Sequence, residues 1–184
     1  AMISELRKWN ADRLKTDKMP VGMGVGVNTD NVVTGNIGSS KRMDFTMIGD
    51  GVNLAARLEG SCKTYGAQII ISEFTQTKLK GIYALRELDR IVVKGKTEPV
   101  SIFEVLDFHD DETFPARMDV VGHFTEGLAH YRNTKFDDAT RSFKAALDAN
   151  SEDVPSKLYI ERCELFKKSP PPKDWSGEWV MTEK

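Results

Sequence analysis

The sequence of 184 residues has few cysteines and histidines and no long hydrophobic run. Cys62 and Cys163 lie in different segments without metal-ligand spacing, so we expect free thiols and no disulfide. The longest apolar runs have the length of strands, whereas a membrane span needs about 20 residues. With no signal-peptide pattern either, we expect a cytoplasmic location and no direct membrane contact for this segment, although the parent protein can still be membrane-anchored.

An excess of charge of one sign is also absent. The 26 Lys and Arg residues nearly balance 28 Asp and Glu residues, which leaves a net charge of −2 and no basic surface for nucleic acid. The three histidines, His109, His123 and His130, have no carboxylate or serine partner at a useful spacing, so we assign them no catalytic role. The hydrophobic fraction of 40% is sufficient for the core of one or two small domains.

One run, Lys41 to Glu59, has a pattern that indicates chemistry. Within it, Ile48-Gly49-Asp50-Gly51 predicts a tight turn, and either of the last two residues can cap the helix that follows. Asn53 and Arg57 are four residues apart and therefore project from the same side of that helix. An amide and a permanently charged guanidinium on one face can hold a sugar and a phosphate.

This run resembles the signature of the class III nucleotidyl cyclases, which make cyclic AMP or cyclic GMP from a nucleoside triphosphate. The resemblance extends to Val21 to Thr29, Val32 to Ser39, Ile69 to Ser72 and Val92 to Val100. The resemblance covers residues 1–108. This part of the chain is similar to the carboxy-terminal half of a cyclase catalytic domain of bacterial or cyanobacterial type.

The resemblance implies a role for four residues. Thr46 contacts the base and Asn53 orients the ribose, while Arg57 stabilises the charge at the reacting phosphorus and Lys94 holds the triphosphate. Threonine in the base position is similar to bacterial adenylate cyclases, and it disfavours a guanylate-specific enzyme because Thr46 cannot contact guanine as a carboxylate would. Cyclisation shifts negative charge from the attacked phosphorus to pyrophosphate, and the two cations suit that demand.

Simpler interpretations exist for the same residues. Arg57 alone can be a solvated helix residue, Lys94 a lysine of a surface hairpin and Thr46 an ordinary strand residue. The glycines of Gly22 to Gly26 alternate with Met and Val, and no Gly-Lys-Ser/Thr follows, which favours a strand crowded by neighbouring backbone over a phosphate loop.

The resemblance also implies what the segment lacks. Class III cyclases bind two Mg²⁺ or Mn²⁺ ions through two aspartates, and take a base-contacting lysine, from the half of the domain that precedes this sequence. We therefore expect no metal ligand in this chain and no activity from it alone. The expected partners are ATP and a second cyclase domain or the missing amino-terminal half, in a homodimer.

The predicted fold of residues 1–108 is α+β, a mixed or antiparallel sheet with helices on one face. An amphipathic helix runs from Met2 to Leu14, and Val21 to Val27 and Val32 to Asn36 are predicted to form a hairpin around Asn28 to Asn31. The helix that carries Asn53 and Arg57 is predicted to end at Gly60, with a short helical turn after it. Further strands are expected from residue 67 to 72, 83 to 93 and 100 to 107.

A different module follows the linker of residues 109–118. Residues 119–168 predict a small all-α helical hairpin with a bend at Asn133 to Lys135 and a third helix from Val154 to Lys167. The spacing of Gly127, Ala139 and Phe143 resembles one tetratricopeptide repeat, and a generic helical hairpin fits almost as well. Because one repeat cannot bury its own faces, we expect it to lean on the preceding domain or on another subunit.

The tail, residues 169–184, begins with three prolines and contains Trp175 and Trp179, which we expect to pack against a surface. Two hypotheses for function follow from the whole sequence. The chain is either the substrate-binding side of an adenylate cyclase or a non-catalytic regulatory or interaction module derived from a cyclase half-domain.

Overall fold

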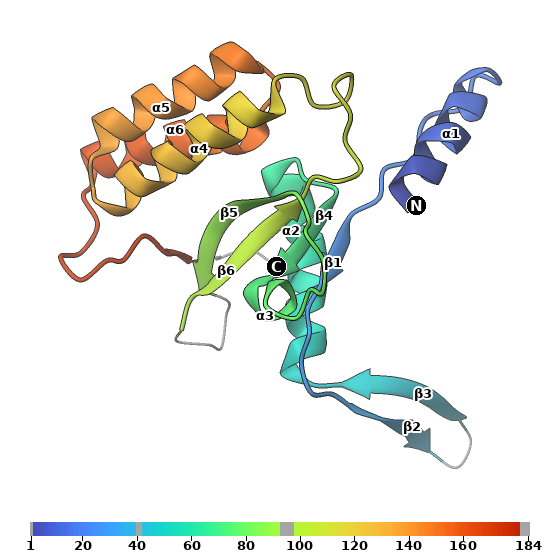
Figure 1. Ribbon diagram of the computed structural model, residues 1–184. Helices are drawn as coiled ribbons and strands as arrows, with labels where there is room; N and C mark the ends of the chain where they lie inside the picture. The colour runs from blue at the N-terminus through green and yellow to red at the C-terminus, as the bar shows by residue number, and fades with distance from the viewer. Residues whose placement is uncertain (1, 40–41, 93–97, 181–184) are drawn as a thin grey trace.

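The computed structural model describes residues 2–39, 42–92 and 98–180 (Figure 1). In chain order its elements are α1 (Met2–Leu14), β1 (Val25–Val27), β2 (Val33–Ser39), β3 (Arg42–Ile48), α2 (Asp50–Tyr65), β4 (Ile69–Ser72), α3 (Glu73–Gln76), β5 (Leu85–Val92), β6 (Val100–Val105), α4 (Arg117–Arg132), α5 (Phe136–Ala149), α6 (Val154–Lys168) and β7 (Trp179–Val180). No described helix is both long and apolar enough to cross a membrane.

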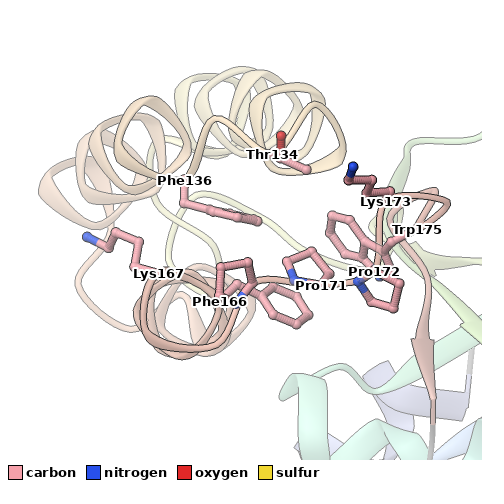
Figure 2. Close-up of a pocket in the computed structure, with 9 residues that line it drawn as sticks. Thr134, Phe136, Phe166, Lys167, Pro171, Pro172, Lys173 and Trp175 are labelled. Atoms are coloured by element: carbon pink, nitrogen blue, oxygen red, sulfur yellow. The ribbon is translucent and has the colours of Figure 1, made fainter.

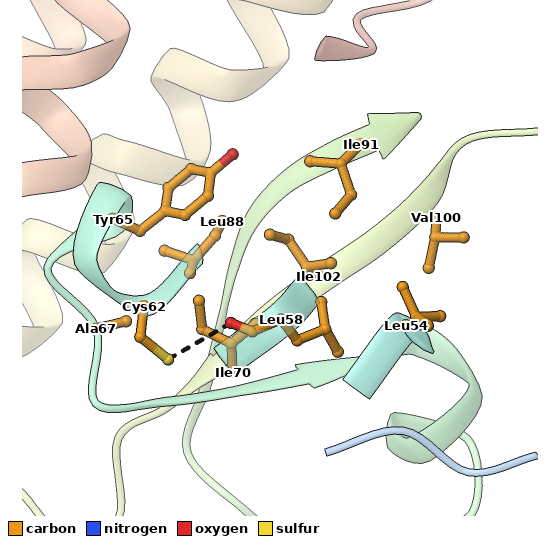
Figure 3. Close-up of a cluster of buried hydrophobic side chains, with 10 residues drawn as sticks. All are labelled: Leu54, Leu58, Cys62, Tyr65, Ala67, Ile70, Leu88, Ile91, Val100 and Ile102. Atoms are coloured by element: carbon orange, nitrogen blue, oxygen red, sulfur yellow. Dashed lines mark hydrogen bonds between the residues drawn. The ribbon is translucent and has the colours of Figure 1, made fainter. Parts of the chain in front are cut away.

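Five strands form a mixed sheet in the order β1-β4-β6-β5-β7. The central pairs, β4 with β6 and β6 with β5, are antiparallel, and β1 and β7 add parallel strands at the two edges. Apolar side chains of α2 and of the sheet interlock in one buried cluster (Figure 3). The cluster contains Leu54, Leu58, Cys62, Tyr65, Ala67, Ile70, Leu88, Ile91, Val100 and Ile102. The predicted α+β class, with a mixed sheet and helices, is confirmed.

The strands β2 and β3 pair with each other and form a separate antiparallel ribbon, which extends away from the sheet (Figure 1). The predicted hairpin between residues 21–27 and 32–36 is therefore wrong, because β1 pairs with β4 instead. Residues 28–31, predicted as the turn of this hairpin, form hydrogen bonds with other elements instead. Asn28 Nδ2 donates to the carbonyl oxygen of Gly51 at 3.1 Å, and Asn28 Oδ1 accepts from Ser72 Oγ at 2.6 Å. Turn-forming residues here make tertiary contacts.

The helix α2 is longer than predicted. It continues through Gly60 and ends at Gly66, which has a left-handed φ of 64° and donates its N–H to the carbonyl oxygens of Cys62 and Lys63. The prediction of a helix end at Gly60 is wrong because Leu58 and Cys62, on either side of it, are buried in the cluster against the sheet. Packing of that face outweighs the low helix propensity of one exposed glycine.

The helices α4, α5 and α6 form a second layer with its own buried cluster. As predicted, the chain bends between α4 and α5 at residues 133–135. A Cβ atom at Gly127 of α4 would lie 2.5 Å from the ring of Phe143 of α5, so only glycine permits this close approach. The ring of Trp175, from the tail, lies 5.1 Å from that of Tyr131, which confirms that this tryptophan packs as an anchor.

The three-helix layer rests on the sheet through buried and half-buried arginines. The predicted contact with the preceding part of the chain is therefore present. Among the described residues, ion pairs join the two parts between Arg86 and Asp153, Arg132 and Glu87, and Arg162 and Asp89. In addition, Leu158 of α6 packs against the cluster between α2 and the sheet. The last two residues of the predicted linker, residues 109–118, belong to α4, and the linker includes Phe114, which is buried against Leu106 and Val120.

Candidate functional site

Two of the predicted site residues, Asn53 and Arg57, lie one turn apart on α2. Asn53 is exposed and the side chain of Arg57 is half-buried. The helix begins directly after Gly49, which adopts φ 157° and ψ 160° and provides no side-chain cap, so the predicted cap at Asp50 or Gly51 is wrong. A backbone conformation that L-residues rarely adopt thus joins β3 directly to the helix with the polar pair.

The amino-terminal half of α2 is held by backbone contacts on one side. A Cβ at Gly26 of β1 would lie 2.2 Å from the carbonyl oxygen of Ala55 and 2.3 Å from the amide nitrogen of Glu59. The predicted strand crowded by neighbouring backbone is confirmed at this position. The side chain of Asp30 packs against Gly51, where an added Cβ would lie 2.4 Å from Asp30 Cβ. These glycines therefore set the depth at which α2 lies, and with it the positions of its polar residues.

Sequence analysis missed the role of Asn28 and Asp30 in this site. Both belong to the loop between β1 and β2 and contact the first turn of α2 at Gly51. Their residue types are those of an ordinary turn, so composition alone predicts a hairpin. The only signal was their place directly after the glycine-rich strand, which the structure packs against α2.

Thr46 lies on β3, opposite Gly35 of β2, and its side chain is exposed. Because β3 runs into α2 through Gly49 alone, Thr46 lies on the strand next to the helix that carries Asn53 and Arg57. Lys94 lies outside the described residues. The structure thus brings Asn53 and Arg57 onto one helix face, adds Thr46 on the adjoining strand and gives no position for Lys94.

The carboxy-terminal end of α2 is held by charged groups rather than by glycines. Tyr65 is 1% exposed, and its hydroxyl donates to Asp89 Oδ2 at 2.5 Å. Arg162 Nη1 donates to the same oxygen at 2.6 Å. Burial, together with the negative charge of Asp89, raises the pKa of Tyr65 far above its ordinary value, so its hydroxyl stays a donor. Sequence analysis missed this group because Arg162 is 73 residues from Asp89.

In the part of the chain that the structure describes, no group of three or more His, Cys, Asp or Glu side chains is placed to hold a metal ion. A hollow of about 640 Å³ lies elsewhere, between the end of α6, the start of α5 and the proline tail (Figure 2). Phe136, Phe166 and Trp175 are among its lining residues, and none of the predicted site residues contributes to it.

Comparisons with known proteins identify relatives along this chain. It is 34% identical over 146 residues to the terminal-differentiation-specific adenylate cyclase of Dictyostelium discoideum, which covers 78% of this chain and 7% of that protein. It is 40% identical over 111 residues to the adenylate cyclase of Anabaena cylindrica, which covers 56% of this chain and 22% of that protein. The chain therefore spans less than a quarter of the length of either relative.

Among solved structures, the adenylyl cyclase CyaB from P. aeruginosa is 32% identical, with a TM-score of 0.48 over 59% of this chain and 57% of that one. The sequence model of one protein family, the adenylate and guanylate cyclase catalytic domain, matches residues 1–106. These residues include β3 and the whole of α2. The chain belongs to the adenylate and guanylate cyclase catalytic domain family.

Proposed function

We propose that this chain supplies the substrate side of an adenylate cyclase site, which converts ATP to 3′,5′-cyclic AMP and pyrophosphate. The observation that carries the proposal is the placement of Asn53 and Arg57 on one face of α2, directly after β3, within the matched residues. Both relatives described above are named adenylate cyclases. An arginine fork and a neighbouring amide are the groups that a reacting nucleotide needs on one side.

Each proposed role follows from the chemistry of the side chain. Thr46 contacts the adenine through its hydroxyl, and Asn53 orients the ribose so that the 3′-hydroxyl faces the α-phosphorus. Arg57 stabilises the negative charge that builds up at that phosphorus as pyrophosphate leaves. Lys94 holds the triphosphate tail. Because Arg57 is half-buried on a helix fixed at both ends, its charge is held in place before the reaction begins.

The metal ligands are proposed to come from outside this chain. Class III cyclases use divalent cations, and the described residues contain no group of three or more His, Cys, Asp or Glu side chains placed to hold one. We therefore assign Mg²⁺ or Mn²⁺ to a metal-bearing half of the domain, located in another part of the polypeptide or in another chain, and expect this segment to be inactive alone. Nucleotide binding without turnover is the alternative function that the same observation favours.

A second cyclase domain is the proposed protein partner, in a homodimer. The ribbon of β2 and β3 carries Met43, Phe45 and Met47 on one face, with exposed fractions of 61%, 72% and 56%. Three large apolar side chains at alternate positions of a projecting ribbon suit a contact with another protein surface. Replacing Phe45 by Asp should shift the mass measured by light scattering toward the monomer. The control Phe74→Asp changes a phenylalanine that is 43% exposed and lies on α3.

We further propose the division of the chain into a cyclase part at residues 1–108, a linker at 109–118, a tetratricopeptide-like segment at 119–168 and a tail at 169–184. A cytoplasmic location is proposed for these parts, because ATP is the substrate. The alignment with the Dictyostelium protein covers 78% of the chain, more than residues 1–106, so the similarity to a cyclase continues into the helices.

The test is an assay of cyclic AMP formation from ATP with Mn²⁺. It is run with this chain alone, with the metal-bearing half of the domain alone and with the two mixed. Product in the mixture only is the expected result. Nucleotide binding without product in any sample would support the non-catalytic alternative, and preferred turnover of GTP in a parallel assay would contradict the role given to Thr46.

A further inference from the structure

Three arginines connect the helical layer to strand β5, but they differ in what they reach. Arg86 binds Asp153 at the start of α6, and Arg132 binds Glu87 with both nitrogens of its fork. Only Arg162 binds a carboxylate that also holds α2, the helix with Asn53 and Arg57. Among these three arginines, Arg162 therefore links α6 to the proposed site helix.

This ion pair is buried from every side. Asp89 is 0% exposed and the side chain of Arg162 is 4% exposed. Besides its bond to Asp89, Arg162 donates Nη2 to the hydroxyl of Tyr65 at 3.4 Å, and its guanidinium lies 4.1 Å from the ring centre of Trp179. Without Arg162, the buried carboxylate of Asp89 would lose the cation that binds it directly, which is strongly unfavourable.

Other contacts of α6 fall on the same end of α2. A Cβ at Gly66, the residue that ends α2, would lie 2.7 Å from Val154 Cβ. Leu158 packs on the cluster that contains Tyr65. The hydroxyl of Tyr159 donates to the carbonyl oxygen of Leu88 at 3.0 Å, one residue before Asp89. One face of α6 thus abuts the end of α2 and the strand residue that binds it.

A rigid helix transmits a movement of its end. Arg57 lies eight residues before Tyr65 on α2, a distance of about 12 Å along the axis at about 1.5 Å per residue. A tilt of about 5° at one end therefore displaces the other by about 1 Å, and a misplacement of about 1 Å in a reacting complex can lower the rate by about a hundredfold.

We propose that Arg162 is a positioning residue for the cyclase reaction. Through Asp89 and Tyr65 it fixes the carboxy-terminal end of α2 and thereby the direction in which Arg57 points. The helical layer is then a part of the catalytic unit. The proposal rests on the proposed function, since it concerns the same site.

The experiment measures cyclic AMP formation by this chain mixed with the metal-bearing half, for the wild type and four variants. Arg162→Met removes the charge, Tyr65→Phe removes one hydroxyl and keeps the ring, and Arg162→Lys restores a charge at that position. Arg132→Met is the matched control, because it breaks another arginine pair between the helices and β5 without touching α2. All rates are expressed per folded molecule, with the folded fraction taken from near-ultraviolet circular dichroism.

We expect kcat to fall by about tenfold or more in Arg162→Met and less in Tyr65→Phe, with KM for ATP nearly unchanged, because the loss concerns alignment of a group that acts in the transition state. Arg162→Lys should recover part of the loss, and Arg132→Met should keep the wild-type kcat. If Arg162→Met does not fold, Tyr65→Phe still decides, since it removes a single hydrogen bond.

Unchanged kcat in both Arg162→Met and Tyr65→Phe, or an equal fall in Arg132→Met, would overturn the positioning role while the proposed function stands. A wild-type mixture without cyclic AMP would refute the proposed function, and this proposal with it. Hydrogen exchange of residues 50–65 gives a second readout: it should be faster in Arg162→Met than in Arg132→Met, and equal rates would contradict the proposal.

Discussion

Gly26 of β1 and Ala55 of α2 are so close that a Cβ atom on Gly26 would lie 2.2 Å from the carbonyl oxygen of Ala55. The neighbour is backbone within a helix, so no side-chain rotation can relieve the contact. The same added atom would lie 2.3 Å from the amide nitrogen of Glu59. The absence of a side chain at this strand position therefore determines how near α2 approaches the sheet edge, and Arg57 lies between the two contacted residues.

The substitution Gly26→Ala should consequently destabilise the fold. Overpacking against backbone costs about 1 to 3 kcal/mol, and a contact this short falls at the upper end, so we expect a loss of about 3 kcal/mol in the free energy of unfolding. Urea denaturation measures it. Gly22→Ala is the control in the same glycine-rich segment, because an added Cβ there meets nothing within 4 Å. Similar losses in both variants would contradict the packing argument.

Asp153 caps α6 and is buried against the sheet, so its removal should also destabilise the protein. One carboxylate oxygen accepts from Arg86 at 2.6 Å, and the other accepts from the amide and hydroxyl of Ser156 at 3.1 Å and 2.6 Å. Asp153→Ala removes the helix cap, which contributes about 1 kcal/mol. It also removes one of the two carboxylates that pair with the buried guanidinium of Arg86. We therefore expect the free energy of unfolding to fall by about 3 kcal/mol in total.

The control for that measurement is Asp138→Ala, which breaks an ion pair with Arg141 at the surface of α5, where the arginine is 80% exposed. Surface pairs contribute about 0 to 1 kcal/mol, so the unfolding midpoint should hardly move. A loss in Asp138→Ala as large as that in Asp153→Ala would show that the effect comes from the helices themselves and not from their contact with the sheet.

Local features of this fold could be predicted from the sequence. The spacing of Asn53 and Arg57 determines their common face whatever the helix packs against. The bend at residues 133–135 follows from turn-forming residues between two periodic segments, and Trp175 packs because a large ring is costly to expose. These predictions depend on residues within a few positions of each other, where local geometry decides the outcome.

Features that depend on distant partners could not be predicted. Arg86 and Asp153 are 67 residues apart, and nothing in either neighbourhood indicates the other. The loop from Asn28 to Asn31 has the composition of a hairpin turn, but β2 pairs with β3 and leaves that loop to contact α2. Likewise, Gly60 resembles a helix end and is overridden by the burial of Leu58 and Cys62.

His109 lies where the sheet meets the helical layer, and its environment disfavours protonation. Its ring lies 4.3 Å from that of Phe108 and 5.4 Å from that of Phe114. Burial lowers the pKa of His109 from its ordinary value of 6.5 to about 4, and repulsion by the charges of Arg7 and Arg117 acts in the same direction. The neutral imidazole is therefore the form that the folded protein accommodates.

The stability of the protein should consequently depend on pH through His109. A histidine whose folded pKa is depressed contributes stability that is complete above its unfolded pKa and is lost as pH falls toward its folded pKa. The wild type should lose stability between about pH 6.5 and about pH 4. In His109→Gln this component should be absent, which thermal unfolding at intervals across the range would reveal. Parallel curves for the two proteins would contradict the assignment.

Arg57→Ala tests the chemistry of the site most directly. If Arg57 acts on the charge that forms in the transition state, its removal should lower kcat by about a hundredfold or more and leave KM for ATP nearly unchanged. The control is Lys63→Ala, which removes an exposed cation from the last turn of the same helix. Both variants are assayed for cyclic AMP formation with the metal-bearing half added. A rise in KM alone for Arg57→Ala would mean that this arginine only binds the substrate, because an interaction equal in the ground and transition states changes affinity and not turnover.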